Sequence, residues 1–260
     1  YDKIVTDFQN FATKLDIADI HFVPISALNG DNIVKRSERM DWYQGTTLLY
    51  ILENVHISSD FNMIDCRFPV QYVIRPFNDS FHDYRGYAGQ IAGGVFKKGD
   101  EVLILPSGYT STIKSIETMD GQVQEAFPPM AATILLEDDI DISRGDMIVR
   151  INNKPEVTQD MDIMLCWFNE KPLQINGKYF IRHTTNDARC IIKDIRYKLD
   201  INTLHRIQDY NEIKLNDIAR ISIRTTKPLL VDKYKLNRNT GSIILIDEQT
   251  NETVAAGMVI

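Results

Sequence analysis

The feature that most constrains the fold is a change in the spacing of apolar residues at residues 58–62. Before this point, apolar residues recur at every third or fourth position, which is typical of amphipathic helices. After it, apolar and polar residues alternate, as they do in strands with one buried face. We therefore predict a domain boundary here, with helices before it and mainly strands after it.

The part before the boundary is predicted to be α/β. Residues 2–15 form one apolar helical stripe, and residues 45–55 form a shorter one behind Thr46 or Thr47, either of which can cap a helix. The apolar run at residues 20–25 suits a buried strand, in which Pro24 is tolerated where no ladder hydrogen bond is needed. Residues 1–57 are thus expected to belong to one domain.

The part after the boundary is predicted to be all β. Short strand candidates separated by turn signals at residues 58–153 are typical of a small closed antiparallel barrel, because closure removes exposed sheet edges. A second all-β stretch covers residues 154–260. We expect inward-facing alternation in three places: Phe68, Val70, Tyr72 and Ile74; Ile195, Tyr197, Leu199 and Ile201; and Ala219, Ile221 and Ile223.

Charge and composition exclude several functional classes. The chain has 260 residues, with 29 Lys and Arg against 36 Asp and Glu, so its net charge of -7 repels a polyanion and disfavours nucleic acid as a partner. No apolar run approaches the roughly 18 residues that would span a bilayer, and the N-terminus lacks the pattern of a signal peptide. We expect a soluble, cytoplasmic protein whose Cys66, Cys166 and Cys190 are buried thiols.

The segment HFVPISALNGDNIV, residues 21–34, is the first candidate binding motif. A strand ending in Ser26, Ala27 and Leu28, between helices and ahead of β-barrels, resembles the GTPases of the translation-factor class. The resemblance implies that the backbone N–H of Ala27 donates to the guanine carbonyl oxygen, while its small side chain lets the base approach and Ser26 holds the loop. Such a donor would penalise adenine, which presents an amine at that position.

Longer stretches narrow the resemblance. Residues 23–55 resemble the end of the GTPase domain in the large, GTP-hydrolysing subunit of bacterial sulfate adenylyltransferase. Residues 83–108 resemble the second domain shared by all translation-factor GTPases, and IKDIRYKLDINTLHR with the C-terminal segment resembles the third domain of the sulfate-activating subunit. The implied fold is therefore a remnant of a phosphate-loop GTPase domain followed by two antiparallel β-barrels of the translation-factor domain 2 and domain 3 types.

The resemblance also implies an activity and a partner. That family makes adenosine 5'-phosphosulfate and pyrophosphate from ATP and sulfate, a nucleotidyl transfer that is coupled to GTP hydrolysis. The adenylyl-transfer site belongs to a separate small catalytic subunit, which would be the partner of this chain. Basic and apolar residues mix at residues 224–238, where we hypothesise either an ordinary strand and loop or a docking surface for that subunit formed by Lys227, Lys233, Tyr234, Lys235 and Arg238.

Several motifs of a complete GTPase are not found in the sequence. There is no Gly-x-x-x-x-Gly-Lys-Ser/Thr loop, and no Asn-Lys-x-Asp base reader. The glycines of RGYAGQIAGG suit a barrel hairpin, NKPE at Asn153 suits a turn, and the acidic run of residues 137–141 suits a solvated turn. We therefore expect a fragment that begins just beyond the base reader, has no catalytic or metal-ligating residues and is inactive alone; GTP and magnesium would bind the full-length protein.

Two other functions are compatible with this layout. An elongation-factor-like GTPase would hold aminoacyl-tRNA on its barrels, although the acidic total charge disfavours a phosphate-binding face. A free-standing double-barrel adaptor would have no phosphate loop upstream.

Overall fold

The computed structural model describes residues 1–15, 17, 19–55, 61–76, 84–208 and 212–260. The chain divides into two compact units, residues 1–60 and residues 61–260. The predicted boundary at residues 57 and 58 lies outside the described residues. None of the described helices is long and apolar enough to cross a membrane.

The first unit contains two helices, α1 (Asp2–Ala12) and α2 (Leu48–Asn54), as the apolar spacing predicts. Thr47 caps α2, because its hydroxyl accepts a hydrogen bond from the N–H of Tyr50 at 3.3 Å. Of the described residues in this unit, only Ala12 and Asn32 are buried. Polar contacts, rather than a packed apolar core, therefore define the local geometry of this unit.

The predicted strand at residues 20–25 is wrong, because no ladder forms there. A strand needs a neighbouring strand to take its backbone groups, and side chains take them here instead. The carbonyl of Phe22 accepts from the hydroxyls of Tyr1 and Tyr43 at 3.1 and 3.2 Å, and the carbonyl of Pro24 accepts from Asn32 at 2.8 Å.

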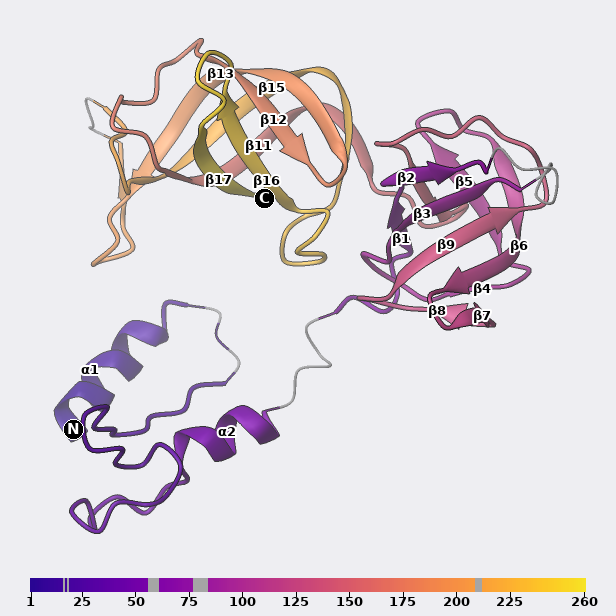
Figure 1. Cartoon of the computed structure of the whole chain (residues 1–260). Helices are drawn as coiled ribbons and strands as arrows, with labels where there is room; N and C mark the ends of the chain where they lie inside the picture. Colours follow the sequence, from indigo (N-terminus) through magenta and orange to yellow (C-terminus); the bar gives the residue numbers. More distant parts are fainter. Residues whose placement is uncertain (16, 18, 56–60, 77–83, 209–211) are drawn as a thin grey trace. The chain divides into compact units, whose positions relative to one another are not determined.

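The second unit is mainly β, as predicted, and holds two large antiparallel sheets and one small two-stranded sheet (Figure 1). The first sheet has the order β1-β10-β5-β6-β9-β3-β2, with β7 paired to β6, and β4 and β8 pair separately. The strands are β1 (Arg67–Pro69), β2 (Tyr72–Ile74), β3 (Gly86–Gln90), β4 (Phe96–Lys97), β5 (Glu101–Leu105), β6 (Thr110–Thr118), β7 (Gly121–Val123), β8 (Glu125–Ala126), β9 (Ala131–Leu136) and β10 (Met147–Arg150).

One stretch of chain supplies both edges of this first sheet. β1 pairs with β10, β2 pairs with β3, and only Val70 and Gln71 lie between them, so the ends of the sheet meet and we call it the first barrel. Because β1 and β2 pair with different strands, the predicted alternation does not continue from one to the other. Phe68 and Val70 are buried as predicted, but Tyr72 is 68% exposed and Val73 packs on the core instead.

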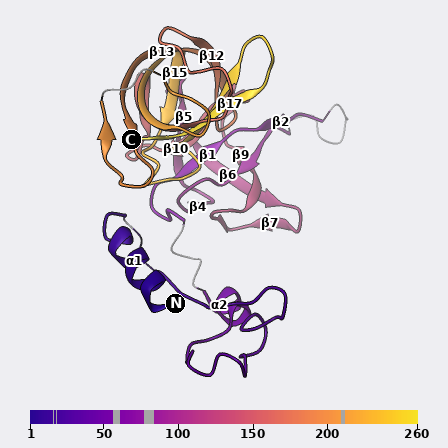
Figure 2. The ribbon, with the colours of Figure 1, turned by 90° about the vertical axis from the view of Figure 1, so that its left-hand side faces the viewer.

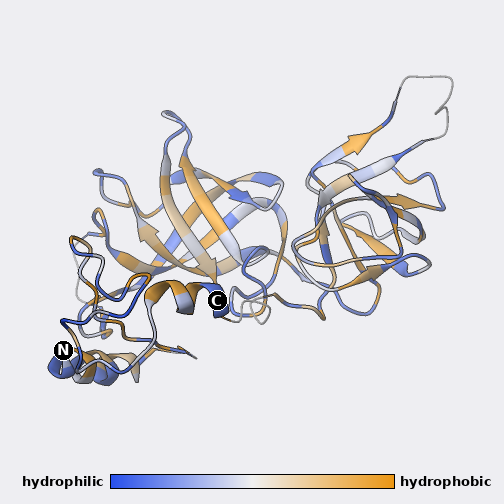
Figure 3. Cartoon of the chain, turned by 60° about the horizontal axis from the view of Figure 1, so that its bottom comes forward, coloured by the Kyte–Doolittle hydropathy of each residue, from blue (hydrophilic) through white to orange (hydrophobic). Residues whose placement is uncertain are grey.

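The second sheet closes into a barrel, here called the second barrel (Figure 2). Its order is β12-β16-β17-β11-β15-β13-β14, and β12 also pairs with β13, which completes the ring. The strands are β11 (Glu156–Trp167), β12 (Lys178–His183), β13 (Asn186–Leu199), β14 (Arg206–Ile207), β15 (Ile218–Val231), β16 (Ser242–Asp247) and β17 (Thr253–Val259). Hydrophobic and hydrophilic residues are interspersed along these strands (Figure 3).

The alternation in the second barrel is confirmed in one strand and broken in another. Ala219, Ile221 and Ile223 of β15 all point into the core and are fully buried. In β13, register shifts follow Ile192 and Ile195, and the strand ends at Leu199, so Ile201 is exposed rather than buried. Bulges shift the face that a strand presents, which a strict period of two cannot anticipate.

The cysteines and the acidic run largely follow expectation. Cys66 and Cys190 are buried thiols, while Cys166 is only half-buried. The acidic run forms a bend followed by irregular chain, in which Asp138 accepts a hydrogen bond from Ser111 and Arg85 pairs with Asp139 and Asp141. Among the residues that the structure describes, no group of three metal-ligating side chains gathers.

The two barrels share an apolar contact, and they form one compact unit. β5 and β10 are apolar on both faces: one face lines the first barrel's core, and the other packs against Leu230 of β15. Whether residues 58–153 and 154–260 behave as separate domains stays a prediction. The residues in this contact are Leu103, Leu105, Met147, Val149 and Leu230.

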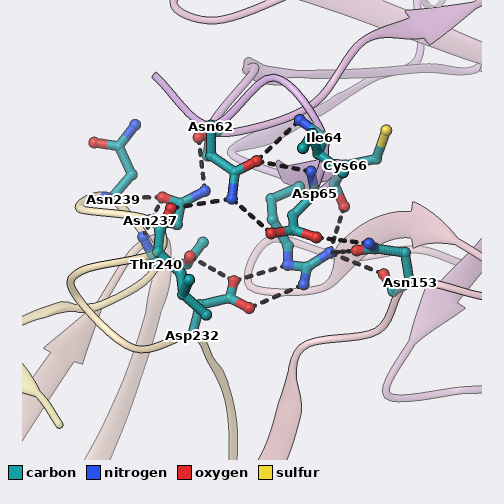
Figure 4. A network of polar contacts seen from close by, with 12 residues as sticks. Asn62, Ile64, Asp65, Cys66, Asn153, Asp232, Asn237, Asn239 and Thr240 are labelled. Atoms are coloured by element: carbon teal, nitrogen blue, oxygen red, sulfur yellow. Dashed lines mark hydrogen bonds and ion pairs between the residues drawn. The ribbon is translucent and has the colours of Figure 1, made fainter. Parts of the chain in front are cut away.

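A buried arginine, Arg67, also joins the barrels, and its partners Cys66, Asn153 and Asp232 are labelled in Figure 4. The side chain of Arg67 is 3% exposed, and its Nε and Nη2 atoms donate to both carboxylate oxygens of Asp232 at 2.8 and 2.9 Å. Its Nη1 atom donates to the carbonyl of Cys66 and to both oxygens of Asn153. Arg67 is therefore buried beside Phe68, so the two neighbouring residues are both buried and the strand does not alternate here.

Further residues extend this cluster, which we call the Arg67 network: Asn62, Asp65, Arg67, Asn153, Asp232, Asn237 and Thr240. Thr240 donates to Asp232 at 2.7 Å, and Asn237 of the second barrel donates to the carbonyl of Ala92 in the first barrel at 2.9 Å. Asn153 does form the predicted turn, and its amide also donates to Asp65 at 2.6 Å. Every buried charge in the network thus has a partner, as burial requires.

We expect Arg67→Met to lower the free energy of unfolding by about 3–5 kcal/mol, because it leaves the Asp232 carboxylate buried without its cation. The matched control is Arg220→Met, which breaks the Arg220–Asp162 pair, whose side chains are 31% and 28% exposed. Solvent screening should limit that loss to below about 1 kcal/mol. Urea denaturation measures both values, and equal losses would contradict the role given to Arg67.

A second prediction concerns His183, which is buried at the end of β12 and whose Nε2 donates to the carbonyl of Thr240 at 2.7 Å. Burial lowers the pKa of His183, although the Thr240 carbonyl and the Asp232 charge partly oppose this. The unfolded chain therefore binds more protons below pH ~6.5, so stability should fall by up to about 1.4 kcal/mol between pH 7.5 and 5.5. The test is urea denaturation at both pH values.

The control is His183→Gln, whose amide can donate the same hydrogen bond without titrating. This variant should lose that part of the pH dependence. An identical pH dependence in the two proteins would show that His183 does not bind fewer protons in the folded state.

Candidate functional site

The predicted motif forms a short closed loop in the first unit, which we call the Ser26 loop (residues 26–31). The N–H of Ser26 donates to the carbonyl of Asp31 at 3.3 Å, and the N–H of Gly30 donates back to the carbonyl of Ser26 at 2.8 Å. Gly30 has a φ of 75°, a left-handed conformation that glycine adopts at no steric cost. The two ends of the loop are therefore joined by main-chain hydrogen bonds.

The tip of the loop faces solvent. Ala27 is exposed, Leu28 is 94% exposed and Ser26 is half-buried. The N–H of Ala27 has no acceptor among the described residues, so it is available to a ligand. A free amide beside a side chain of one carbon leaves room for a flat ring, and the contact to guanine that the resemblance implies stays a prediction.

Two residues hold the base of the loop. Asp31 accepts from the hydroxyl of Ser37 at 2.7 Å and from Arg39 at 2.6 Å, and these two hydrogen bonds lower the pKa of its carboxyl group. Asn32 is 1% exposed and bonds to residues on both sides of the loop. The hydroxyl of Ser26 does bind within the loop, because it accepts from the amide of Asn29 at 3.1 Å.

An aromatic cluster lies in the same unit. The Tyr1 and Trp42 rings are 5.1 Å apart, and Tyr43 contacts both. Burial raises the pKa of Tyr43, whose hydroxyl lies 3.1 Å from the carbonyl of Thr46. These rings support the segment that follows the Ser26 loop.

The hypothesised docking segment is only partly a surface. Leu229, Leu230 and Val231 are buried in the barrels, so the apolar residues at its centre cannot contact a partner. Tyr234 is half-buried, and its N–H donates to the carbonyl of Val259 at 3.0 Å. Of the five candidate residues, Lys227, Lys233, Lys235 and Arg238 are exposed.

Sequence reasoning missed Asn32 as part of the site. It is a polar residue in a turn-rich stretch, where asparagine is common, and only its burial distinguishes it. The sequence does signal the turn itself, because Asn29, Gly30, Asp31 and Asn32 are consecutive residues that favour turns and left-handed backbone, but this signal does not single out Asn32.

Comparisons with known proteins agree with this layout. Residues 160–260 match the family described as GTP-eEF1A C-terminal domain-like. The bifunctional enzyme CysN/CysC of Mycobacterium tuberculosis is 51% identical over the whole chain, and sulfate adenylyltransferase subunit 1 of Bacteroides thetaiotaomicron is 47% identical. Along its entire length, the chain is therefore similar to proteins named sulfate adenylyltransferase subunit 1 or CysN/CysC. It spans 42% and 54% of the length of these two relatives, so about half of each has no counterpart in the sequence given.

A solved structure has the same fold as this chain. The crystal structure of sup35 complexed with GDP covers the whole chain with a TM-score of 0.69 at 20% identity, and the chain covers 63% of that structure. At this identity the similarity shows the fold alone: the translation-factor arrangement of an N-terminal unit followed by two barrels.

Proposed function

We propose that this chain is part of the GTP-hydrolysing subunit of sulfate adenylyltransferase. In the full-length protein, GTP hydrolysis would be coupled to the formation of adenosine 5'-phosphosulfate and pyrophosphate from ATP and sulfate. The observation that carries the proposal is 45–51% identity, along the entire chain, to proteins named as sulfate adenylyltransferase subunit 1 or CysN/CysC. In this proposal, the protein would act in the cytoplasm.

The Ser26 loop would supply the contact to the guanine base. The free N–H of Ala27 would donate to the carbonyl oxygen O6, and the small side chain would leave room for the ring. Adenine carries an amine at this position, so it would leave the amide unpaired, at a cost of about 1–3 kcal/mol. The geometry supports this role, because the amide is exposed and the loop is closed behind it.

The residues present fit only part of GTP. The exposed amide fits the base, whereas the sequence offers no Gly-x-x-x-x-Gly-Lys-Ser/Thr loop for the phosphates, and no described cluster would hold magnesium. In this proposal, magnesium and the phosphates bind to parts of the full-length protein beyond these 260 residues. When bound, magnesium would neutralise charge on the phosphates.

The proposed partner is the small catalytic subunit that transfers the adenylyl group. Lys227, Lys233, Tyr234, Lys235 and Arg238 remain our candidates for the docking surface, with the cationic side chains making the contacts. The alternative function, binding aminoacyl-tRNA, draws no support from the fold, because a likeness at 20% identity does not extend to ligands.

The proposal predicts that pyrophosphate release depends on GTP. Full-length protein mixed with its small subunit, ATP and sulfate should release pyrophosphate at least about fivefold faster with GTP than without it. A non-hydrolysable GTP analogue should give no sustained stimulation. A rate independent of GTP, or retention of tRNA by the purified full-length protein, would contradict the proposal.

A second prediction concerns the base contact. Ala27→Leu in the full-length protein should raise the Kd for GTP at least about tenfold, equivalent to ~1.4 kcal/mol, because the larger side chain obstructs the ring. Ala27 is exposed, so the substitution does not overpack a core. The matched control is Ala131→Leu, at an exposed alanine of β9, which should leave the Kd unchanged. Equal Kd values for Ala27→Leu and the unsubstituted protein would refute this assignment.

A further inference from the structure

We propose that Asn32 is a positioning residue that fixes the Ser26 loop so that the Ala27 amide can read guanine O6. The inference rests on the proposed function and extends it to a residue that need not touch the nucleotide. Its starting observation is burial: Asn32 is the one polar residue that is buried among the described residues of the first unit.

The side chain of Asn32 ties together the segments on either side of the loop. Its Nδ2 donates to the carbonyl of Pro24 at 2.8 Å, before the loop, and its Oδ1 accepts from the N–H of Ser37 at 2.9 Å, after it. Nδ2 also lies 3.4 Å from the sulfur of Met40. The amide thus uses both its donor and its acceptor, and replacing either would leave a buried polar group unpaired.

The backbone of Asn32 adds a third attachment. Its carbonyl accepts from the N–H of Leu48 at 2.9 Å, and the next carbonyl, of Ile33, accepts from the N–H of Leu49 at 2.9 Å. These N–H groups belong to the first turn of α2, where the helix itself offers them no partner. The Ser26 loop is therefore anchored to the start of α2 through Asn32.

The conformation at this position also favours asparagine. Asn32 has a φ of 55°, in the left-handed region that asparagine enters more readily than most other residues with a side chain. With Gly30 at 75°, it reverses the chain and brings Asp31 opposite Ser26. The residue type, its burial and its backbone conformation all serve the closure of the loop.

Asn32 is a better candidate for this role than the neighbouring ion pair. Arg39, which pairs with Asp31, has a side chain that is 60% exposed, so solvent screens the pair and its contribution is small. Asn32 is shielded, and its hydrogen bonds span the loop. Because the loop is already held in place, the Ala27 amide loses little conformational entropy when the base binds. Preorganised donors gain binding free energy in this way.

The test compares GTP with 6-thio-GTP, which differs only in having sulfur in place of O6, a weaker hydrogen-bond acceptor. In full-length protein without substitutions, the Kd for 6-thio-GTP should exceed that for GTP by about tenfold. In Asn32→Asp, where an oxygen replaces the Nδ2 donor opposite the Pro24 carbonyl, the ratio should fall below about threefold. If Asn32→Asp does not fold, Asn32→Gly removes the side chain and keeps the left-handed backbone without strain.

The matched control is Asn237→Asp, the same change at a buried asparagine of the second unit, which donates to the carbonyl of Ala92. This change should destabilise the fold to a similar degree. The ratio of the Kd for 6-thio-GTP to the Kd for GTP should nevertheless stay the same as in the unsubstituted protein. If the ratio stays near tenfold in Asn32→Asp, or falls as far in Asn237→Asp, the inference is overturned.

Hydrogen–deuterium exchange provides a readout without nucleotide. In nucleotide-free full-length protein, Asn32→Asp should speed exchange at least about tenfold in peptides covering residues 22–33, because the Gly30 amide loses its support. Peptides from β15 should not change. Unchanged exchange in residues 22–33 would overturn the inference. If the protein without substitutions fails to distinguish GTP from 6-thio-GTP, the O6 contact itself is wrong, and the proposed reading of guanine fails together with the inference.

Discussion

The constraint on which the second unit depends most is the burial of the Arg67 guanidinium. A charge removed from water destabilises the fold unless partners surround it. Here Asp232 comes from the second barrel, whereas Cys66 and Asn153 lie next to strands of the first barrel. The barrels cannot slide past each other without leaving that charge unpaired. The apolar contact around Leu230 buries hydrophobic surface between the barrels, whereas the Arg67 network fixes their relative position.

The first unit also depends on a buried polar group that must be paired, but here the group is the neutral amide of Asn32. No large apolar side chain is buried among its described residues, so packing alone does not fix the Ser26 loop. The buried amide of Asn32 fixes it instead, through carbonyl and N–H groups on either side. A loop built in this way can expose its tip fully and still hold one backbone amide in place, which the proposed hydrogen bond to the guanine carbonyl oxygen requires.

What the sequence predicts well is local. The two helices, the Thr47 cap and the inward residues of β15 all follow from apolar spacing and capping chemistry. What it misses depends on residues that are distant in the sequence. Residues 20–25 have no neighbouring strand, and Tyr72 is exposed because the chain pairs with a different strand after Pro69. Arg67 forms its ion pair with Asp232, 165 residues further along the chain. The resemblance to translation-factor GTPases points to the Ser26 loop, whereas only the burial and the hydrogen bonds of Asn32 reveal its position in that loop. The continuous apolar runs in β5 and β10 did carry a signal, since strands buried on both faces lack alternation.

The most direct test of the central claim, that the Ser26 loop reads guanine, is an experimental structure of the full-length protein with GDP bound. The nitrogen of Ala27 should lie within ~3.2 Å of the guanine O6, in hydrogen-bonding geometry. The Asn32 side chain should keep its contacts to Pro24 and Ser37. Guanine bound away from residues 26–28, or O6 paired to another donor while the Ala27 amide faces solvent, would contradict the claim.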